Sequence, residues 1–392
     1  MDERTKVDCV AKARALAPMI AAAAPRIEAA RELPADLVEA LHEARLWRML
    51  VPRAYGGDEV PVVDYVAAIE EIAAADASTA WCIGQTSVCS TVSRNMKPQV
   101  AEEIFKKNPQ GVLSWGPTNN AKAIAEKGGY RVNGVWPFAS GSKHATWLAA
   151  HCHIHEPDGQ PRRGADGKPI QKTFLVPRES ATWQDVWHVM GLKGTGSNTY
   201  TLTDVLVPED YSIDYHALNA TGRREHGPLY AFTIYQLFGA SFPAVALGIA
   251  RAMLESFCAL AQKKTPTGQT TMLRDNPVIQ SQVGIAQSQL AAARAFLFLA
   301  LDEAWREAQT GAISLDQRVR LRMACINATQ QARQVAETTY LAAGATAVFE
   351  SNAFERRFRD MHAVSQQAQS QLSIYEALGR HFLGLPLNSR LI

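Results

Sequence analysis

The chain has 392 residues, of which 47% are hydrophobic and 20% charged, a composition typical of globular proteins with room for two or three domains. Its 40 Lys and Arg residues nearly balance 38 Asp and Glu residues, and the net charge of +2 predicts no nucleic-acid partner and no anionic membrane partner. Six scattered cysteines without a Cys-x-x-Cys pair predict free thiols and a reducing, cytoplasmic location.

The N-terminal segment does not have the pattern of a signal peptide. Charges of both signs are mixed between Asp2 and Lys12, and the Ala-rich run of residues 15–24 is interrupted by Pro18. No run of about 20 apolar residues is expected to span a membrane. The sequence therefore predicts a cytoplasmic protein without a membrane partner.

A helical apolar period characterises the first 108 residues. Pro34 occupies a plausible first helical position, and the pattern recurs over residues 64–73 and 78–92. This predicts an N-terminal α-helical domain over residues 1–109. On the last of these helices, two side chains could face a substrate cavity, although a place in the core is the commoner one for a Trp on a helical face: Trp81 and Cys89.

From residue 110 the apolar period changes from 3.6 to 2, which predicts a central β domain over residues 110–225. Asn133-Gly134 is typical of a two-residue hairpin turn, because both positions favour positive φ. Further strands are expected over residues 172–176, 183–190 and 200–207.

Four small residues follow the aromatic pair Trp136 and Phe138 in this domain, namely residues 139–142. They leave room for a flat, ring-shaped ligand and place the hydroxyls of Ser140 and Ser142 beside it. An ordinary strand end, in which serines cap or turn the backbone, explains the same residues.

Two other patterns in the β domain suggest ligands that the wider context does not support. His151, His153 and His155 alternate and would share one face of a strand, as a zinc or copper site requires. No carboxylate with suitable ligand spacing accompanies them, so no metal is expected. Residues 194–196 read Gly-Thr-Gly but lead into a strand, whereas a dinucleotide fingerprint leads into a helix. No NAD(P)H-binding module is therefore predicted.

The chain becomes helical again over residues 226–392. Pro243 is expected to open a helix that ends near Lys263, and Asn276-Pro277 a second one that ends near Gly311. Ser314 and Gln317 form a capping-box pattern for a third, and a fourth begins near Asn352. Their broad apolar faces predict a C-terminal four-helix bundle.

Three segments in this order resemble the acyl-CoA dehydrogenase superfamily: residues 133–142, 191–197 and 358–363. The resemblance implies an α+β multidomain fold with an N-terminal helical domain, a central β-barrel domain and a C-terminal bundle, assembled as a homotetramer. It also implies a flavin, FMN or FAD, with the Ser140 hydroxyl against N5. The other residues that it assigns to the flavin are Trp115, Asn119, Phe138, Gly141, Ser142, Thr195, Ser197, Gly344 and Thr346.

A dehydrogenase of this superfamily needs a carboxylate that removes a proton α to the thioester. The run Ile374-Tyr375-Glu376 imitates the family's base motif, but it lies about two helical turns too far along, and Ala368 stands near the expected position. Some dehydrogenases carry this base on another helix, so acyl-CoA dehydrogenase activity remains an alternative. A non-catalytic flavin-binding protein is a second alternative.

Residues 343–348 together with residues 358–363 more closely resemble the two-component flavin-dependent aromatic monooxygenases built on this fold. The resemblance implies an oxygenase component that takes reduced flavin from a separate NAD(P)H:flavin reductase. With O2 it would form a C4a-(hydro)peroxyflavin and hydroxylate a small aromatic substrate. That substrate would be a phenol or an indole-type compound such as indole or indole-3-acetate.

The sequence departs from that pattern at Gln367, where such hydroxylases often carry a His that acts as a base, a role that an amide cannot fill. His362 lies five residues earlier, about 140° away around a continuous helix, and is expected to face elsewhere. Either the substrate needs no deprotonation or the base comes from another segment. The candidate catalytic residues are Ser140, His362 and Gln367.

Overall fold

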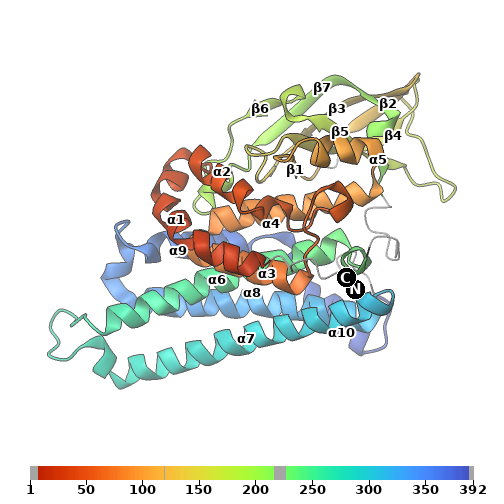
Figure 1. Cartoon of the computed structure of the whole chain (residues 1–392). Helices are drawn as coiled ribbons and strands as arrows, with labels where there is room; N and C mark the ends of the chain where they lie inside the picture. Colours follow the sequence, from red (N-terminus) through yellow and green to blue (C-terminus); the bar gives the residue numbers. More distant parts are fainter. Residues whose placement is uncertain (1–7, 119, 216–226, 388–392) are drawn as a thin grey trace.

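The computed structural model describes residues 8–118, 120–215 and 227–387. Helices come first, a β-sheet follows, and long helices complete the chain, as the sequence predicts (Figure 1). The first helices are α1 Cys9–Ala30, α2 Ala35–Glu43, α3 Val62–Ala75, α4 Ala77–Ser90 and α5 Pro98–Ala101. Helix α4 begins where the Asp76 side chain accepts hydrogen bonds from the backbone N–H and the hydroxyl of Thr79. This cap fixes the start of the helix that carries Trp81.

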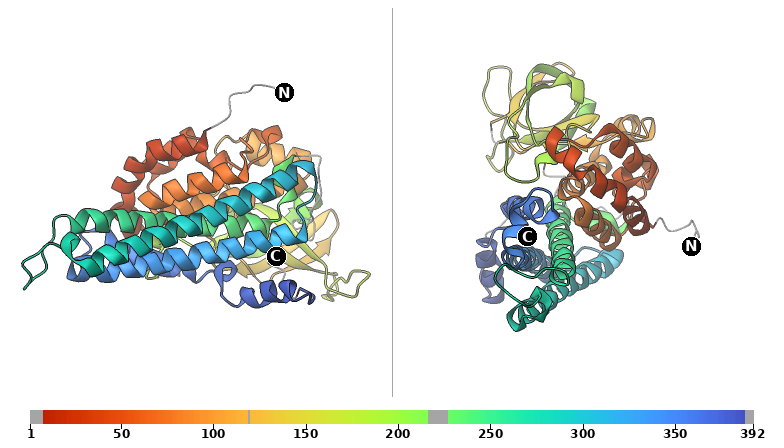
Figure 2. Two further views of the ribbon diagram at one scale, coloured as in Figure 1. Left: turned by 90° about the horizontal axis from the view of Figure 1, so that it is seen from below. Right: turned by 90° about the vertical axis from the view of Figure 1, so that its left-hand side faces the viewer.

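Within the described residues, eight strands form one mixed sheet in the order β6-β7-β3-β2-β4-β5-β8, with β1 pairing with β4. The β1–β4 and β2–β4 pairs are parallel and the others antiparallel. The sheet is strongly curled, while β6 and β8 remain its edges (Figure 2). Its strands are β1 Leu113–Ser114, β2 Lys122–Glu126, β3 Gly129–Trp136, β4 Trp147–His155, β5 Gln171–Pro177, β6 Thr182–Gln184, β7 Thr199–Pro208 and β8 Ser212–Asp214.

Two details of the sheet correct the sequence predictions. Asn133-Gly134 is not a hairpin turn, because β3 continues through it with a register shift against β7. Asn133 Oδ1 accepts the backbone N–H of Asp204, and this bond stabilises the irregular pairing. The chain reverses earlier, between β2 and β3, where Gly128 has a φ of 86°.

The strand predicted over residues 183–190 is also too long, since β6 ends at Gln184. The backbone N–H groups of Val186 and Trp187 are bound by Asn198 Oδ1 and make no strand ladder. The segment after β6 is therefore a loop, and it forms part of the site described below.

The C-terminal helices are α6 Ile234–Ala261, α7 Pro277–Thr310, α8 Leu315–Ala343, α9 Ala353–Ser365 and α10 Ile374–Phe382. The predicted caps at Asn276 and Ser314 are confirmed by side-chain oxygens that accept from the first turn of each helix, and Asn352 caps α9 in the same way. Helix α6 begins nine residues before Pro243, because Thr233 and Gln236 form a capping box and the proline lies inside the helix.

Helix α6 is the central element of the molecule. It packs on α3 and α4 on one side and on α7, α8 and α9 on the other (Figures 1 and 2). Both α6 and α7 are long and apolar enough to cross a membrane, contrary to the sequence prediction that no run qualifies. For α6 this composition reflects burial, since 94% of its apolar window lies inside the protein, against 28% for α7. Core helices of globular proteins have the same composition.

Candidate functional site

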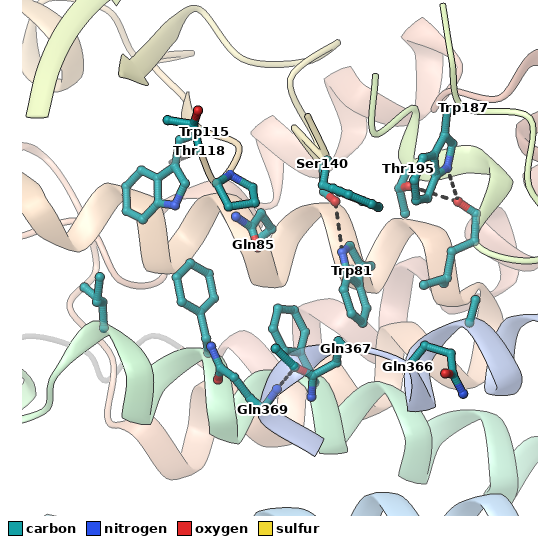
Figure 3. Close-up of a pocket in the computed structure, with 18 of the residues that line it drawn as sticks. Trp81, Gln85, Trp115, Thr118, Ser140, Trp187, Thr195, Gln366, Gln367 and Gln369 are labelled. Atoms are coloured by element: carbon teal, nitrogen blue, oxygen red, sulfur yellow. Dashed lines mark hydrogen bonds between the residues drawn. The ribbon is translucent and has the colours of Figure 1, made fainter. Parts of the chain in front are cut away.

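A cavity of about 850 Å³ lies where α4, α6, the end of α9 and the loops of the sheet meet (Figure 3). Its volume falls in the range of small-molecule sites. Aromatic, imidazole and amide side chains together make up more than half of its wall. The lining includes Trp81, Gln85, Trp115, Phe138, Ser140, His151, His153, Gln171, Trp187, Leu192, Thr195, Tyr215, Tyr235, Phe238, Phe242, His362, Gln366, Gln367, Ala368 and Gln369.

A chain of hydroxyl groups ends at Ser140 in the wall of this cavity. Thr195 Oγ1 donates to the carbonyl oxygen of Leu192 over 2.9 Å, and it lies 2.7 Å from Ser197 Oγ. Ser197 Oγ in turn lies 2.6 Å from Ser140 Oγ. Trp81 Nε1 donates to Ser140 Oγ over 3.1 Å (Figure 3).

The direction of this chain follows from counting protons. Thr195 has one hydroxyl proton and gives it to a carbonyl, so Ser197 must donate to Thr195. Ser197 then has no proton left for Ser140, and the Ser140 hydroxyl must donate to Ser197. Ser140 Oγ therefore presents an unshared lone pair to the cavity. Toward the cavity, Ser140 is therefore an acceptor in this arrangement.

The backbone holds the small-residue segment 139–142 against the loop before β7. Ala139 N–H donates to Asn198 O, and Gly141 N–H donates to Thr195 O. Gly141 has a φ of 73°, and an added Cβ would meet the Thr86 side chain, so a glycine is required here. The small residues thus allow the close approach on which the hydroxyl chain depends.

Four aromatic rings form a continuous wall along the cavity. Trp81 stacks on Phe242 with ring centroids 4.1 Å apart, and Phe242 stacks on Phe238 at 5.8 Å. Phe238 meets Trp115 edge to face at 6.0 Å. Phe238 and Phe242 share one face of α6 because they lie four residues apart. A planar aromatic ligand is complementary to such a wall.

Amide groups occupy the wall where α9 ends. Helix α9 stops at Ser365, and Gln367 has an extended backbone and caps the short 3-10 helix of residues 368–370. The expected separation of about 140° between His362 and Gln367 is wrong for this reason, because no continuous helix joins them. Both residues line the same cavity. The Gln367 amide binds Gln369 N–H and the Ser370 hydroxyl.

The three alternating histidines of β4 make separate contacts. His151 Nδ1 lies 2.7 Å from Thr173 Oγ1, His153 Nε2 lies 3.1 Å from Gln171 Nε2, and His155 Nδ1 lies 2.9 Å from Gly159 O. Among the described residues no group of three His, Cys, Asp or Glu side chains is arranged to hold a metal ion. Burial lowers the pKa of His151 to about 4, so its imidazole is neutral at physiological pH.

Several predicted site residues lie outside the cavity wall. Cys89 is buried behind Gln85, whose Nε2 is 3.6 Å from the sulfur. Gly141, Ser142 and Ser197 lie behind Ser140, and Asn119 is outside the described residues. Gly344 and Thr346 follow α8, and Lys264 Nζ donates to Thr346 Oγ1 over 2.7 Å. By contrast Trp81, Trp115, Phe138, Ser140, Thr195, His362 and Gln367 all meet at the cavity.

Several residues that line the cavity were not predicted from the sequence. The alternation of His151 and His153 was considered only as a metal pattern and rejected as one, whereas the same period brings both side chains to the cavity. Phe238 and Phe242 lie in the segment placed before the expected helix start at Pro243, so their helical spacing was not recognised. Trp187 was assigned to a strand. A search for aromatic residues four apart before Pro243 would have found the α6 pair.

The residues present fit a flavin. An isoalloxazine ring is flat and largely apolar, and the aromatic wall and the volume of the cavity suit it. Its reduced form carries a proton on N5, and the free lone pair of Ser140 is an acceptor for such a proton. The site therefore has a shape and a hydrogen-bond polarity that match a reduced flavin.

Comparison with known proteins identifies the family. Residues 9–108 match the family model described as acyl-CoA dehydrogenase, N-terminal domain, and residues 240–371 match acyl-CoA dehydrogenase, C-terminal domain. Together the two models cover more than half of the chain.

Named relatives and solved structures extend over almost the whole chain. Indole-3-acetate monooxygenase of Pseudomonas putida is 26% identical, over 90% of this chain and 88% of the relative. The flavin-dependent monooxygenase, oxygenase subunit HsaA, of Rhodococcus jostii is 27% identical, over 96% of this chain and 99% of the relative. The crystal structure of 3-HSA hydroxylase from Rhodococcus sp. RHA1 superimposes with a TM-score of 0.88 at 25% identity, covering 98% of this chain and 99% of that one. With matching domains, fold and relatives, the chain belongs to the acyl-CoA dehydrogenase family.

Proposed function

We propose that this chain is the oxygenase component of a two-component flavin-dependent monooxygenase that hydroxylates a small aromatic substrate. The observation that carries the proposal is the polarised hydroxyl chain that ends at Ser140 beside an aromatic cavity. When bound, reduced flavin supplies two electrons to O2, so that one oxygen atom enters the substrate and the other leaves as water. The names of the relatives at 26% and 27% identity support the same activity.

The residues of this chain contribute binding, orientation and exclusion of water. Ser140 Oγ would accept a hydrogen bond from the N5–H group of a bound reduced flavin, because its own hydroxyl proton is committed to Ser197. Phe238 and Phe242 orient a planar substrate and, with Trp81, keep the site apolar. Gln367 stabilises the turn after α9, and His362 lines the same cavity wall.

The dehydrogenase alternative needs a carboxylate at the cavity, and the described lining residues include none. Ala368 lines the cavity near the position expected for that base, whereas Glu376 lies on α10 and is not part of the wall. This arrangement favours oxygenation over removal of a proton from an acyl thioester.

The decisive experiment follows the isotope of the oxygen. The protein is mixed with chemically reduced FMN or FAD and indole, or a phenol, under ¹⁸O2, and the product is analysed by mass spectrometry. The proposal predicts a hydroxylated product with one ¹⁸O atom and dependence on the protein. Hydrogen peroxide as the sole oxygen product would contradict it, as would anaerobic reduction of bound flavin by an acyl-CoA.

The remaining partners are part of the same proposal. A separate NAD(P)H:flavin reductase supplies the reduced flavin, and the six free cysteines agree with a cytoplasmic location. A homotetramer is supported by large apolar side chains that are exposed in the last turn of α8, in the segment after it and at the end of α10, among them Leu341, Val348, Phe349, Phe382 and Leu383. Gly344 and Thr346 lie on this exposed segment, so a neighbouring copy is the route by which they would reach a flavin. Analytical ultracentrifugation of Phe349→Asp tests the assembly, with dissociation expected.

A further inference from the structure

His151 lies in the cavity wall beside Trp115, and Figure 3 shows Trp115 and Trp187 toward opposite sides of Ser140. Three contacts fix the imidazole. Its Nδ1 lies 2.7 Å from Thr173 Oγ1, and its ring meets Trp115 and Tyr215 edge to face, each at 5.1 Å. The side chain is therefore held in one orientation before any ligand arrives.

The contact with Thr173 determines which nitrogen carries the proton. Thr173 is fully buried, and His151 Nδ1 is the one hydrogen-bond partner of its hydroxyl among the described residues. If Nδ1 donated, the buried Thr173 hydroxyl proton would have no acceptor. If the hydroxyl donates to Nδ1, both groups are satisfied and the imidazole proton is on Nε2.

We propose that His151 is a specificity-determining residue, whose Nε2–H donates a hydrogen bond to an oxygen acceptor on the aromatic substrate. The inference rests on the proposed function for its ligand class, and it narrows that class to aromatics that carry a carbonyl, phenol or ether oxygen. Among the described residues, Nε2 has no hydrogen-bond partner, and the side chain lines the cavity. A ligand oxygen completes the hydrogen bonding of the ring.

The electrostatic surroundings keep this donor neutral. Thr173, Trp115 and Tyr215, which contact the ring, are uncharged at neutral pH, and burial lowers the pKa of His151. A neutral donor recognises a neutral oxygen without placing an unpaired charge in an apolar cavity. It does not act as a general base in this tautomer, because Nδ1 is engaged and Nε2 is protonated.

Binding of two matched ligands tests the proposal. 1-Indanone and indene have the same bicyclic size, but only 1-indanone carries an acceptor oxygen. Isothermal titration of the full chain with each ligand, in the presence of oxidised FMN and without turnover, gives the ratio of their dissociation constants. We expect 1-indanone to bind more tightly by about three- to tenfold, as one neutral hydrogen bond implies.

His151→Phe keeps an aromatic edge against Trp115 and Tyr215 but removes the donor. We expect it to reduce the ratio to about one while indene affinity stays within about threefold of wild type. His155→Phe, on the same face of β4 but outside the cavity wall, is the matched control and should leave the ratio unchanged. An unaltered ratio in His151→Phe would overturn the proposal.

A second measurement does not depend on that variant folding. Solid-state ¹⁵N NMR of the histidine-labelled protein reports which ring nitrogens carry protons, and the His151 tautomer is expected to be Nε2–H at pH 7. Thr173→Val, which is nearly isosteric, should yield a mixture of tautomers and a smaller indanone preference. A wild-type Nδ1–H tautomer would refute the assignment. None of these measurements involves O2, so they remain informative if the ¹⁸O experiment fails, and the reverse also holds.

Discussion

Substitution of Ser197 by alanine isolates the role of the hydroxyl chain, because Ser197 lies behind Ser140 and does not line the cavity. In the wild-type protein the Ser140 proton is committed to Ser197, and Ser140 Oγ accepts from a reduced flavin. In Ser197→Ala the Ser140 hydroxyl loses its acceptor and can turn its proton toward the cavity. Oxidised flavin, whose N5 is an acceptor, then gains the hydrogen bond that reduced flavin loses.

The magnitude follows from one buried hydrogen bond exchanged for another. A neutral hydrogen bond contributes about 1 kcal/mol net, so the difference in binding free energy between oxidised and reduced flavin should change by about 1–2 kcal/mol. The dissociation constant of oxidised flavin divided by that of reduced flavin should therefore fall roughly 5- to 30-fold. The ratio is measured by anaerobic titration with reduced FMN and by aerobic titration with oxidised FMN. The same change should lower the midpoint potential of the bound flavin in Ser197→Ala relative to the wild-type protein.

Ser142→Ala is the control for this experiment. Ser142 is also fully buried, is two residues from Ser140, and its hydroxyl has no hydrogen-bond partner among the described residues. It should leave the ratio unchanged. If Ser197→Ala leaves the ratio of dissociation constants at its wild-type value, or if Ser142→Ala shifts it equally, the reasoning about proton direction is wrong.

Trp81→Phe removes the donor to Ser140 but keeps an aromatic ring. We expect flavin oxidation to be less tightly coupled to hydroxylation, so that a peroxide assay detects more hydrogen peroxide per hydroxylated product. Gln367→His should lower the free energy of unfolding by about 1 kcal/mol, measured by denaturant titration, because the cap of the following turn is lost. Burial raises the pKa of Asp360 to about 7, so the wild-type protein loses free energy of unfolding as the pH rises from about 4 to 7 and this carboxyl ionises. Asp360→Asn does not ionise, so its free energy of unfolding relative to wild type should rise by up to about 1.4 kcal/mol per pH unit in this range. No further rise is expected above pH 7. The purified chain with flavin alone should not consume NADH in a spectrophotometric assay, and rapid turnover without a reductase would contradict the proposed partnership.

The order of the three regions could be predicted because the apolar period is a local property of the sequence. Periods of 3.6 and 2 are visible in any short window, and the caps at Asn276 and Ser314 are defined by adjacent residues. The family and its fold could be predicted because short motifs, such as residues 358–363, resemble those of the family, and the comparisons confirm both. The domain limits near residues 109 and 225 remain proposals.

Other features depend on contacts that no local pattern contains. Helix α6 begins at Ile234, because the capping box of Thr233 outweighs the signal of Pro243, nine residues after that start. The polarity of Ser140 depends on Ser197, 57 residues away, and on the single carbonyl that takes the Thr195 proton. The turn at Gln367 broke the helical geometry assumed for His362. Each failure concerns tertiary context overriding a local rule.

The backbone N–H and C=O of Leu192 join all three regions of the chain. Its N–H donates to the buried Asp360 carboxyl on α9 over 2.6 Å, and its carbonyl accepts both the Thr195 hydroxyl and Trp187 Nε1. From Thr195 the bonds continue to Ser140 and to Trp81 on α4. A sheet or bundle that is moved alone into another family member would therefore carry only some of the residues that form this hydrogen-bond network. Chimaeras between family members are expected to fold yet lose redox selectivity unless both sides of the Leu192 contact come from one parent.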